Sequence, residues 1–167
     1  MDHNDHVNLL RPANLPQGGV YADLGAGSGA FTLALRELVG LDAAIYAVDK
    51  DHASLNQLDS AHRARFNSNR NPSIELRASL ILLPNDFSRP LDLPPLDGIV
   101  MANSLHFFKD KQKILRHVRE FLKPNGALLT VEYNVDSVRV ARRPTALGME
   151  GSLCWISSLQ CGSRPAR

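Results

Sequence analysis

Three glycines within five residues follow directly on a short apolar run, and this segment limits the possible folds more than any other. The run Val20–Leu24 leads into Gly25-Ala-Gly27-Ser-Gly29, and Asp23 stands two positions before the first glycine. Apolar residues then recur at helical spacing up to Gly40: Phe31, Leu35, Leu38 and Val39. Glycine adopts backbone conformations that other residues avoid and lets the backbone approach a ligand closely. The pattern predicts a buried strand, a tight glycine turn and a helix that ends at Gly40.

Apolar runs and amphipathic stretches alternate along the rest of the chain. Further strands are expected at Ala43–Val48, within Ile74–Leu83, at Asp97–Ala102 and at Ala127–Tyr133. Helices are expected at about 51–66 and 109–122, with a short leading helix or lid over Val7–Leu15 and a tight turn at Lys123-Pro-Asn-Gly126. Unbroken apolar strands that alternate with helices favour a parallel sheet covered on both faces, in a doubly wound α/β layout.

The composition fits a single folded domain. The chain has 167 residues, of which 44% are hydrophobic and 22% charged, so a sizeable core can be buried. The longest apolar run, Ala43–Val48, has six residues, far fewer than the roughly 20 that a membrane helix needs. The polar, acidic start argues against a signal or transit peptide, and two cysteines cannot form a disulfide framework. We therefore expect a cytoplasmic protein without a membrane span.

Charge and composition change abruptly near the end of the chain. Residues 1–134 hold 14 Lys+Arg and 15 Asp+Glu, a net charge of −1, whereas residues 135–167 hold five and two, a net charge of +3. The basic balance therefore belongs to the last segment and argues against a nucleic-acid partner. We expect a folded core over 1–134 and an atypical, poorly ordered tail over 135–167.

The glycine turn also limits the ligand. A dinucleotide site uses G-x-G-x-x-G and places a pyrophosphate at the helix N-terminus. Here the third glycine comes one residue early, and Asp23 places a carboxylate where the phosphate would lie. A carboxylate repels a phosphate and attracts an ammonium group. The turn therefore favours a ligand with a positive group and no phosphate. An NAD-dependent oxidoreductase and a plain strand-to-helix turn are the less favoured alternatives.

The segment Asp-x-Gly-x-Gly-x-Gly at the end of a first strand resembles the signature of class I S-adenosylmethionine-dependent methyltransferases. The likeness extends over residues 20–133, and it is closest to the small methyltransferases of ubiquinone and menaquinone biosynthesis. The resemblance implies a Rossmann-like fold, S-adenosylmethionine as cofactor and methyl transfer to an acceptor, for which we expect a small molecule. A noncatalytic relative that only binds the cofactor is the alternative. The family ends in a further helix and an antiparallel hairpin, which in this chain we expect to be truncated, missing or altered.

The resemblance implies cofactor contacts at ten positions. They are Asp23, Gly25, Ala26, Gly27 and Gly29 in the turn, Asp49 and Lys50 after the second strand, Asp86 and Phe87 after the third, and Asn103 after the fourth. Asp49 would accept hydrogen bonds from the ribose hydroxyls, and Asp86 from the adenine amino group. A solvated turn aspartate and a helix cap are the alternatives for these two residues.

The reaction that the resemblance implies needs few catalytic side chains. The leaving group is a neutral thioether, so alignment of the reacting atoms can supply much of the catalysis. His106 is the candidate general base for an acceptor that arrives protonated, and a histidine that orders its loop is the alternative. Phe107 and Phe108 either wall an acceptor pocket or belong to the core.

Two other features of the sequence bear on partners. No motif for methylating the amino groups of bases or a pyrimidine carbon is present. His3 and His6 stand three apart, but we expect them in a solvated N-terminus rather than at a metal ion. The acceptor and the oligomeric state stay open.

Overall fold

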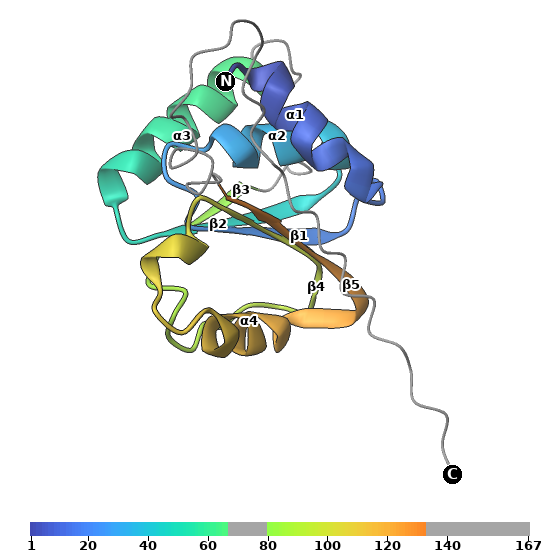
Figure 1. The fold of residues 1–167 in the computed structure, drawn as a ribbon. Coiled ribbons are helices and arrows are strands. Elements are labelled where there is room, and N and C mark those ends of the chain that lie inside the picture. Colours follow the sequence, from blue (N-terminus) through green and yellow to red (C-terminus); the bar gives the residue numbers. More distant parts are fainter. Residues whose placement is uncertain (67–79, 133–167) are drawn as a thin grey trace, which may run out of the picture.

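The computed structural model describes residues 1–66 and 80–132, which form one sheet between layers of helices (Figure 1). The strands are β1 (Val20–Leu24), β2 (Ala44–Asp49), β3 (Leu80–Pro84), β4 (Leu96–Ala102) and β5 (Leu122–Val131). The helices are α1 (His3–Leu10), α2 (Ala30–Val39), α3 (His52–Phe66) and α4 (Lys111–Arg119), with short 3-10 turns η1 (Arg11–Ala13) and η3 (Leu105–Phe107).

All five strands run parallel, in the order β3-β2-β1-β4-β5. β1 lies at the centre and pairs with β2 on one side and with β4 on the other. The chain first builds outward from β1 to β3 and then crosses to the other side for β4 and β5. The strand order thus reverses between β1 and β4, and ligands of such sheets bind outside the carboxyl ends of the strands at this point. The doubly wound α/β fold is confirmed.

The apolar core lies on both faces of the sheet. Helices α1, α2 and α3 cover one face, and α4 lies on the other (Figure 1). Neighbouring residues of β1 point to opposite faces: Tyr21 packs in the cluster of Leu35 from α2, and Ala22 packs in the cluster of Val118 from α4. Both faces are therefore buried, which explains why the strands are continuous apolar runs.

Glycines mark both ends of α2, as the spacing predicts. Gly29 precedes the helix with φ +90°, and Gly40 follows it with φ +79°. Gly29 also lies against α3, because a Cβ atom added there would be 2.8 Å from Cγ of the buried Leu58. Backbone conformation and space both require glycine at position 29.

Three predicted elements have clearly different bounds in the structure. The leading helix begins at His3 rather than Val7, because the side chains of Asp2 and Asp5 cap its first turn reciprocally. α4 ends at Arg119 rather than near 122, because Leu122 already pairs with Leu96 as the start of β5.

The third difference is the tight turn at 123–126, which interrupts β5 instead of preceding it. The pairing jumps from Leu96↔Leu122 to Gly98↔Ala127, so the turn forms a bulge within the strand. The predicted tail at 135–167 and the predicted strand residues 74–79 lie outside the described residues. In the parts of the chain that the structure describes, no helix is long and apolar enough to cross a membrane.

The glycine positions yield a stability prediction. Replacing Gly29 with Ala should lower the free energy of unfolding by about 3 kcal/mol, since it combines a left-handed backbone with a clash against a packed leucine. Replacing Gly27 with Ala should cost about 1 kcal/mol, since its φ is +52° and an added Cβ meets nothing within 4 Å. Urea unfolding followed by circular dichroism measures both. Equal losses would contradict the packing role of Gly29.

Candidate functional site

The glycine turn lies across the carboxyl ends of β2 and β4. The N–H groups of Gly25 and Ala26 donate to the carbonyl of Val48, at 2.8 and 3.1 Å. On the other side, a Cβ atom on Gly25 would lie 2.6 Å from Cβ of Ser104, which follows β4. The turn therefore fits closely between the ends of β2 and β4, the two strands that flank β1, at the edge where the strand order reverses.

Asp23 is a buried carboxyl group at this edge, only 1% exposed. The hydroxyl of Thr32 donates to its Oδ2 at 2.6 Å, and within the described residues no donor reaches Oδ1. Burial raises the pKa of Asp23 to about 7, and the nearby charge of Asp49 adds to the rise, while the Thr32 hydrogen bond opposes it. A cationic group beside Oδ1 would satisfy this oxygen and favour the ionised form.

Asp49 joins the glycine turn to the end of β2. Its Oδ2 accepts from the N–H of Gly27 at 2.8 Å, and its Oδ1 accepts from the N–H of Asp51 at 2.9 Å. Each carboxylate oxygen has two lone-pair sites, so each can accept one more hydrogen bond. Asp49 is therefore part of the turn and still has acceptor capacity for two hydroxyl groups.

Asp86 and Phe87 follow β3 in a tight turn. Asp86 Oδ1 accepts from the N–H and the hydroxyl of Ser88, at 2.9 and 2.6 Å. These hydrogen bonds hold the pKa of the Asp86 carboxyl below its usual value. Phe87 is buried and packs edge to face on Phe108, with ring centroids 5.3 Å apart. The turn thus presents a carboxylate and an aromatic wall together.

Two cavities adjoin at this edge and share the lining residues Gly25, Asp49, Asn103 and Phe107. The one toward β3, here called the β3-side cavity, has a volume of about 260 Å³, and its other lining residues are Lys50, Asp86, Phe87, Ser104 and Phe108. The one toward α1, the α1-side cavity, has a volume of about 420 Å³, and its further lining includes His6, Asp23, Ala26, Gly27, Ser28 and Phe31. Together they form a continuous site along the carboxyl ends of the strands.

Three buried polar atoms on these walls have no hydrogen-bond partner among residues 1–66 and 80–132: Asp23 Oδ1, Asn103 Oδ1 and Ser104 Oγ. Asn103 also has a left-handed backbone with φ +51°, which is uncommon for a residue other than glycine. A buried polar atom without a partner costs free energy, and most native structures avoid it. Their grouping on two adjoining cavities indicates a site built for a polar ligand, with acceptors for a cation and for hydroxyl or amino groups.

The structure brings nine of the ten predicted cofactor positions onto the walls of these cavities. Gly29 is the exception, since it packs on Leu58. The predicted base His106 does not line either cavity; its side chain is 48% exposed and its Nδ1 lies 2.8 Å from Oε2 of Glu132. Phe108 belongs to the core beside Phe87, whereas Phe107 is 77% exposed and lines both cavities.

Sequence reasoning missed His6 and Ser104. The expectation of a solvated N-terminus is wrong for both early histidines: His6 packs edge to face on Phe31 with ring centroids 4.7 Å apart, and His3 Nε2 lies 2.7 Å from Oε2 of Glu37. Burial lowers the pKa of His6. No sequence pattern singles out either residue, since the predicted leading helix begins at Val7, one position after His6.

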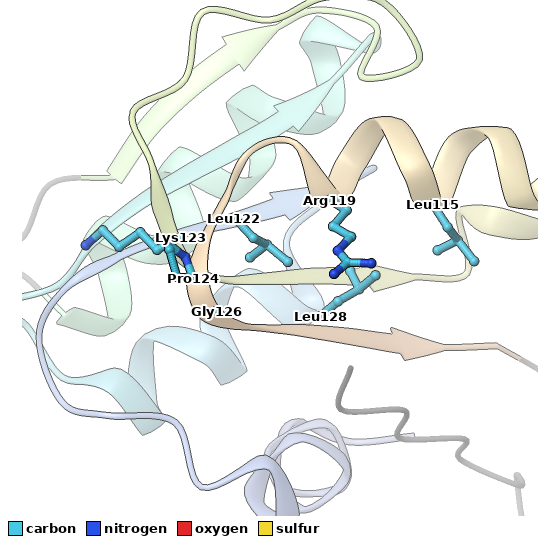
Figure 2. A pocket seen from close by; sticks show the side chains of 7 residues that line it. All are labelled: Leu115, Arg119, Leu122, Lys123, Pro124, Gly126 and Leu128. Atoms are coloured by element: carbon cyan, nitrogen blue, oxygen red, sulfur yellow. The ribbon is translucent and has the colours of Figure 1, made fainter. Parts of the chain in front are cut away.

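A further cavity of about 230 Å³ lies between α4 and the start of β5 (Figure 2). Apolar side chains of Leu115, Leu122 and Leu128 line it, together with Arg119 and Lys123. Leu122 pairs with Leu96, the first residue of β4, so this cavity lies at the opposite, amino-terminal edge of the sheet. This is the edge away from the one where sheets of this type bind ligands.

The raised pKa of Asp23 predicts how stability depends on pH. In the unfolded chain this carboxyl titrates near 3.8 and in the folded protein near 7, so between these values only the folded state holds the proton. Stability should therefore fall as pH rises through this window, by up to about 1.4 kcal/mol per pH unit. Asp23→Asn should remove this slope. Urea unfolding of both proteins at several pH values measures it, and parallel curves would contradict the assignment.

Comparisons with known proteins identify the family and the fold. Residues 22–128 match a family model described as methyltransferase domain. No curated protein matches the chain in sequence. Many solved structures share the fold.

Three solved structures illustrate the likeness. A SAM-dependent methyltransferase from Aquifex aeolicus is 21% identical with a TM-score of 0.62, over 77% of this chain and 64% of that one. A SAM-dependent O-methyltransferase from Thermotoga maritima is 19% identical with a TM-score of 0.60, over 81% and 46%. Coclaurine N-methyltransferase, bound to N-methylheliamine and SAH, is 18% identical with a TM-score of 0.64, over 78% and 36%.

The chain thus spans between about a third and two thirds of the length of these structures. At this level of identity they establish the fold, and the family model establishes membership. Because that model matches more than half of the chain, the protein belongs to the methyltransferase domain family, and it has the fold of S-adenosylmethionine-dependent methyltransferases.

Proposed function

We propose that this protein transfers the methyl group of S-adenosylmethionine to a small-molecule acceptor. The observation that carries the proposal is the group of unpartnered buried polar atoms on two adjoining cavities at the switch point of the sheet. A folded domain has no reason to keep them there without a polar ligand. Residues 1–134 would then form the unit that binds the cofactor.

Each part of the cofactor has a matching environment in the site. Asp49 lies between the two cavities and has free acceptor capacity for the two ribose hydroxyls. Asp86 and the wall of Phe87 suit the adenine in the β3-side cavity. The orphan oxygen of Asp23 suits the methionine ammonium group in the α1-side cavity.

The charges at the site support the same ligand. The α1-side cavity carries the carboxyl groups of Asp23 and Asp49 and has no Lys or Arg among its lining residues. These carboxyl groups would repel a pyrophosphate when they are ionised, whereas a cationic nucleoside would stabilise their ionised forms. This favours S-adenosylmethionine over a dinucleotide.

The protein's own residues would contribute by binding the cofactor and the acceptor and aligning their reacting atoms. Bound S-adenosylmethionine supplies a methyl group on a positively charged sulfur, which leaves as a neutral thioether without need of an acid. The glycine turn would let the backbone approach it closely, and Phe107, exposed and on the wall of both cavities, would face the acceptor. We propose His106 as the group that takes a proton from the acceptor.

Asp49 tests the cofactor site. Asp49→Asn keeps an oxygen that can accept from Gly27 but loses the charge, so we expect S-adenosylhomocysteine to bind about 10- to 100-fold more weakly. Isothermal titration calorimetry measures this. Asp59→Asn is the matched control, because Asp59 pairs with Arg63 on α3 and lines neither cavity. Equal affinities of both variants would contradict the assignment of Asp49.

The transfer itself can be tested without knowing the acceptor. The protein is incubated with methyl-labelled S-adenosylmethionine and a cell extract separated into small molecules, nucleic acids and proteins. We expect a labelled small molecule that differs from the cofactor, and less of it with Asp49→Asn. Label in a macromolecular fraction would contradict the acceptor class. Cofactor binding with no labelled product would favour a noncatalytic relative instead.

A further inference from the structure

Two side chains from neighbouring strand ends form a pair beside the cavities. His106 lies in the turn η3 after β4, and Glu132 directly follows Val131, the last residue of β5. His106 Nδ1 is 2.8 Å from Glu132 Oε2, and the N–H of Leu105 donates to Glu132 Oε1 at 2.7 Å. Both carboxylate oxygens are thus bound to one short turn, which fixes the imidazole relative to the backbone.

This pairing determines which ring nitrogen can act as a base. An ionised carboxylate can only accept a hydrogen bond, so Nδ1 of His106 must carry the hydrogen. In the neutral imidazole the lone pair is then on Nε2. Nε2 makes no hydrogen bond to any of the described residues, and the ring is about half exposed. His106 therefore offers one oriented, accessible proton acceptor.

The imidazole packs on an aromatic side chain that belongs to the wall of the site. Its ring packs on Phe107 with centroids 4.1 Å apart, and Phe107 lines both cavities. Phe107 is 77% exposed, and among the described residues the other exposed large hydrophobic side chain is Met1, at 55%. An exposed aromatic ring beside a cavity favours contact with another flat apolar group.

We propose that Glu132 positions His106 as a general base and that the methyl acceptor is a phenol, a flat aromatic molecule with a hydroxyl group. This inference rests on the proposed function. Phe107 would contact the aromatic ring of the acceptor, and His106 Nε2 would take the hydroxyl proton. A weakly acidic hydroxyl attacks only as its proton leaves, so a positioned base accelerates its methylation. An acceptor that is already ionised gains nothing from such a base.

The step balances with these groups alone. The phenolic oxygen forms a bond to the methyl carbon while the bond between that carbon and sulfur breaks, and its electron pair goes to sulfur. The hydroxyl proton goes to Nε2 of His106. The products are an aryl methyl ether, S-adenosylhomocysteine and an imidazolium ion beside Glu132, which then releases the proton to water.

The test uses two kinds of phenol with the full chain. Catechol is weakly acidic, whereas 4-nitrophenol is largely ionised at mildly alkaline pH. With catechol we expect His106→Asn to lower kcat by about 100-fold and Glu132→Ala by about 10-fold. With 4-nitrophenol both variants should be close to the unmodified protein. All three proteins should bind S-adenosylhomocysteine equally.

The matched control is a second histidine–glutamate pair, His117 and Glu120 on the α4 side, whose Nδ1 and Oε2 are 3.7 Å apart and which lines neither cavity. His117→Asn and Glu120→Ala should leave both phenols unaffected. A nitrogen NMR spectrum adds a readout without turnover: His106 should show hydrogen on Nδ1, and Glu132→Ala should mix the two ring forms.

Other outcomes would contradict either the acceptor class, the catalytic role of the pair or the proposed function. A primary amine and a thiol are offered as acceptors alongside the two phenols. Label on the amine or the thiol but on neither phenol overturns the acceptor class, and so does failure of all four acceptors. Equal slowing of catechol and 4-nitrophenol by the variants makes the pair structural rather than catalytic. If the unmodified protein does not bind S-adenosylhomocysteine, the proposed function itself is overturned. This result can be distinguished from the outcomes above, because they concern only the acceptor and the base.

Discussion

The hydrogen bonds between the glycine turn and the end of β2 hold the site together. Three successive N–H groups, from Gly25 to Gly27, donate to Val48 and Asp49. The parallel register that sets Leu24 opposite Val48 makes these bonds possible. Side chains alternate along a strand, so a shift of one residue would turn Asp49 to the other face of the sheet. The core packing of β1 and β2 therefore determines where this carboxylate lies.

The site contains features that lower the stability of the folded protein. Asp23 is a buried carboxyl with an unbound oxygen, and Asn103 has a left-handed backbone beside another unbound oxygen. Such features are destabilising and persist where the surrounding structure holds them. Here the two apolar layers around the sheet supply that support. Departures of this kind gather at functional sites, because a ligand can satisfy what the protein alone leaves open.

Features that depend on interactions close in the sequence could be predicted, whereas features that depend on contacts between distant segments could not. Position 49 could be predicted because the carboxyl ends of parallel strands meet at one edge, whatever the loops do. The end of α4 could not: Phe121 and Leu122 continue its apolar period, yet Leu122 pairs in β5 and both pack on the same core as the helix. Periodicity reports which side chains are buried, and not from which element they come.

The sequence by itself determined the alternation of strands and helices, the glycine turn and the acidic residue that follows β2, because short-range periodicity, backbone freedom and charge encode these features. Only the tertiary structure brought His6 onto the wall of a cavity, placed Ser104 against Gly25 and joined His106 to Glu132. The last two residues are 26 positions apart in the sequence. Their contact depends on β4 and β5 lying side by side, and no local pattern specifies the distance between two strand ends.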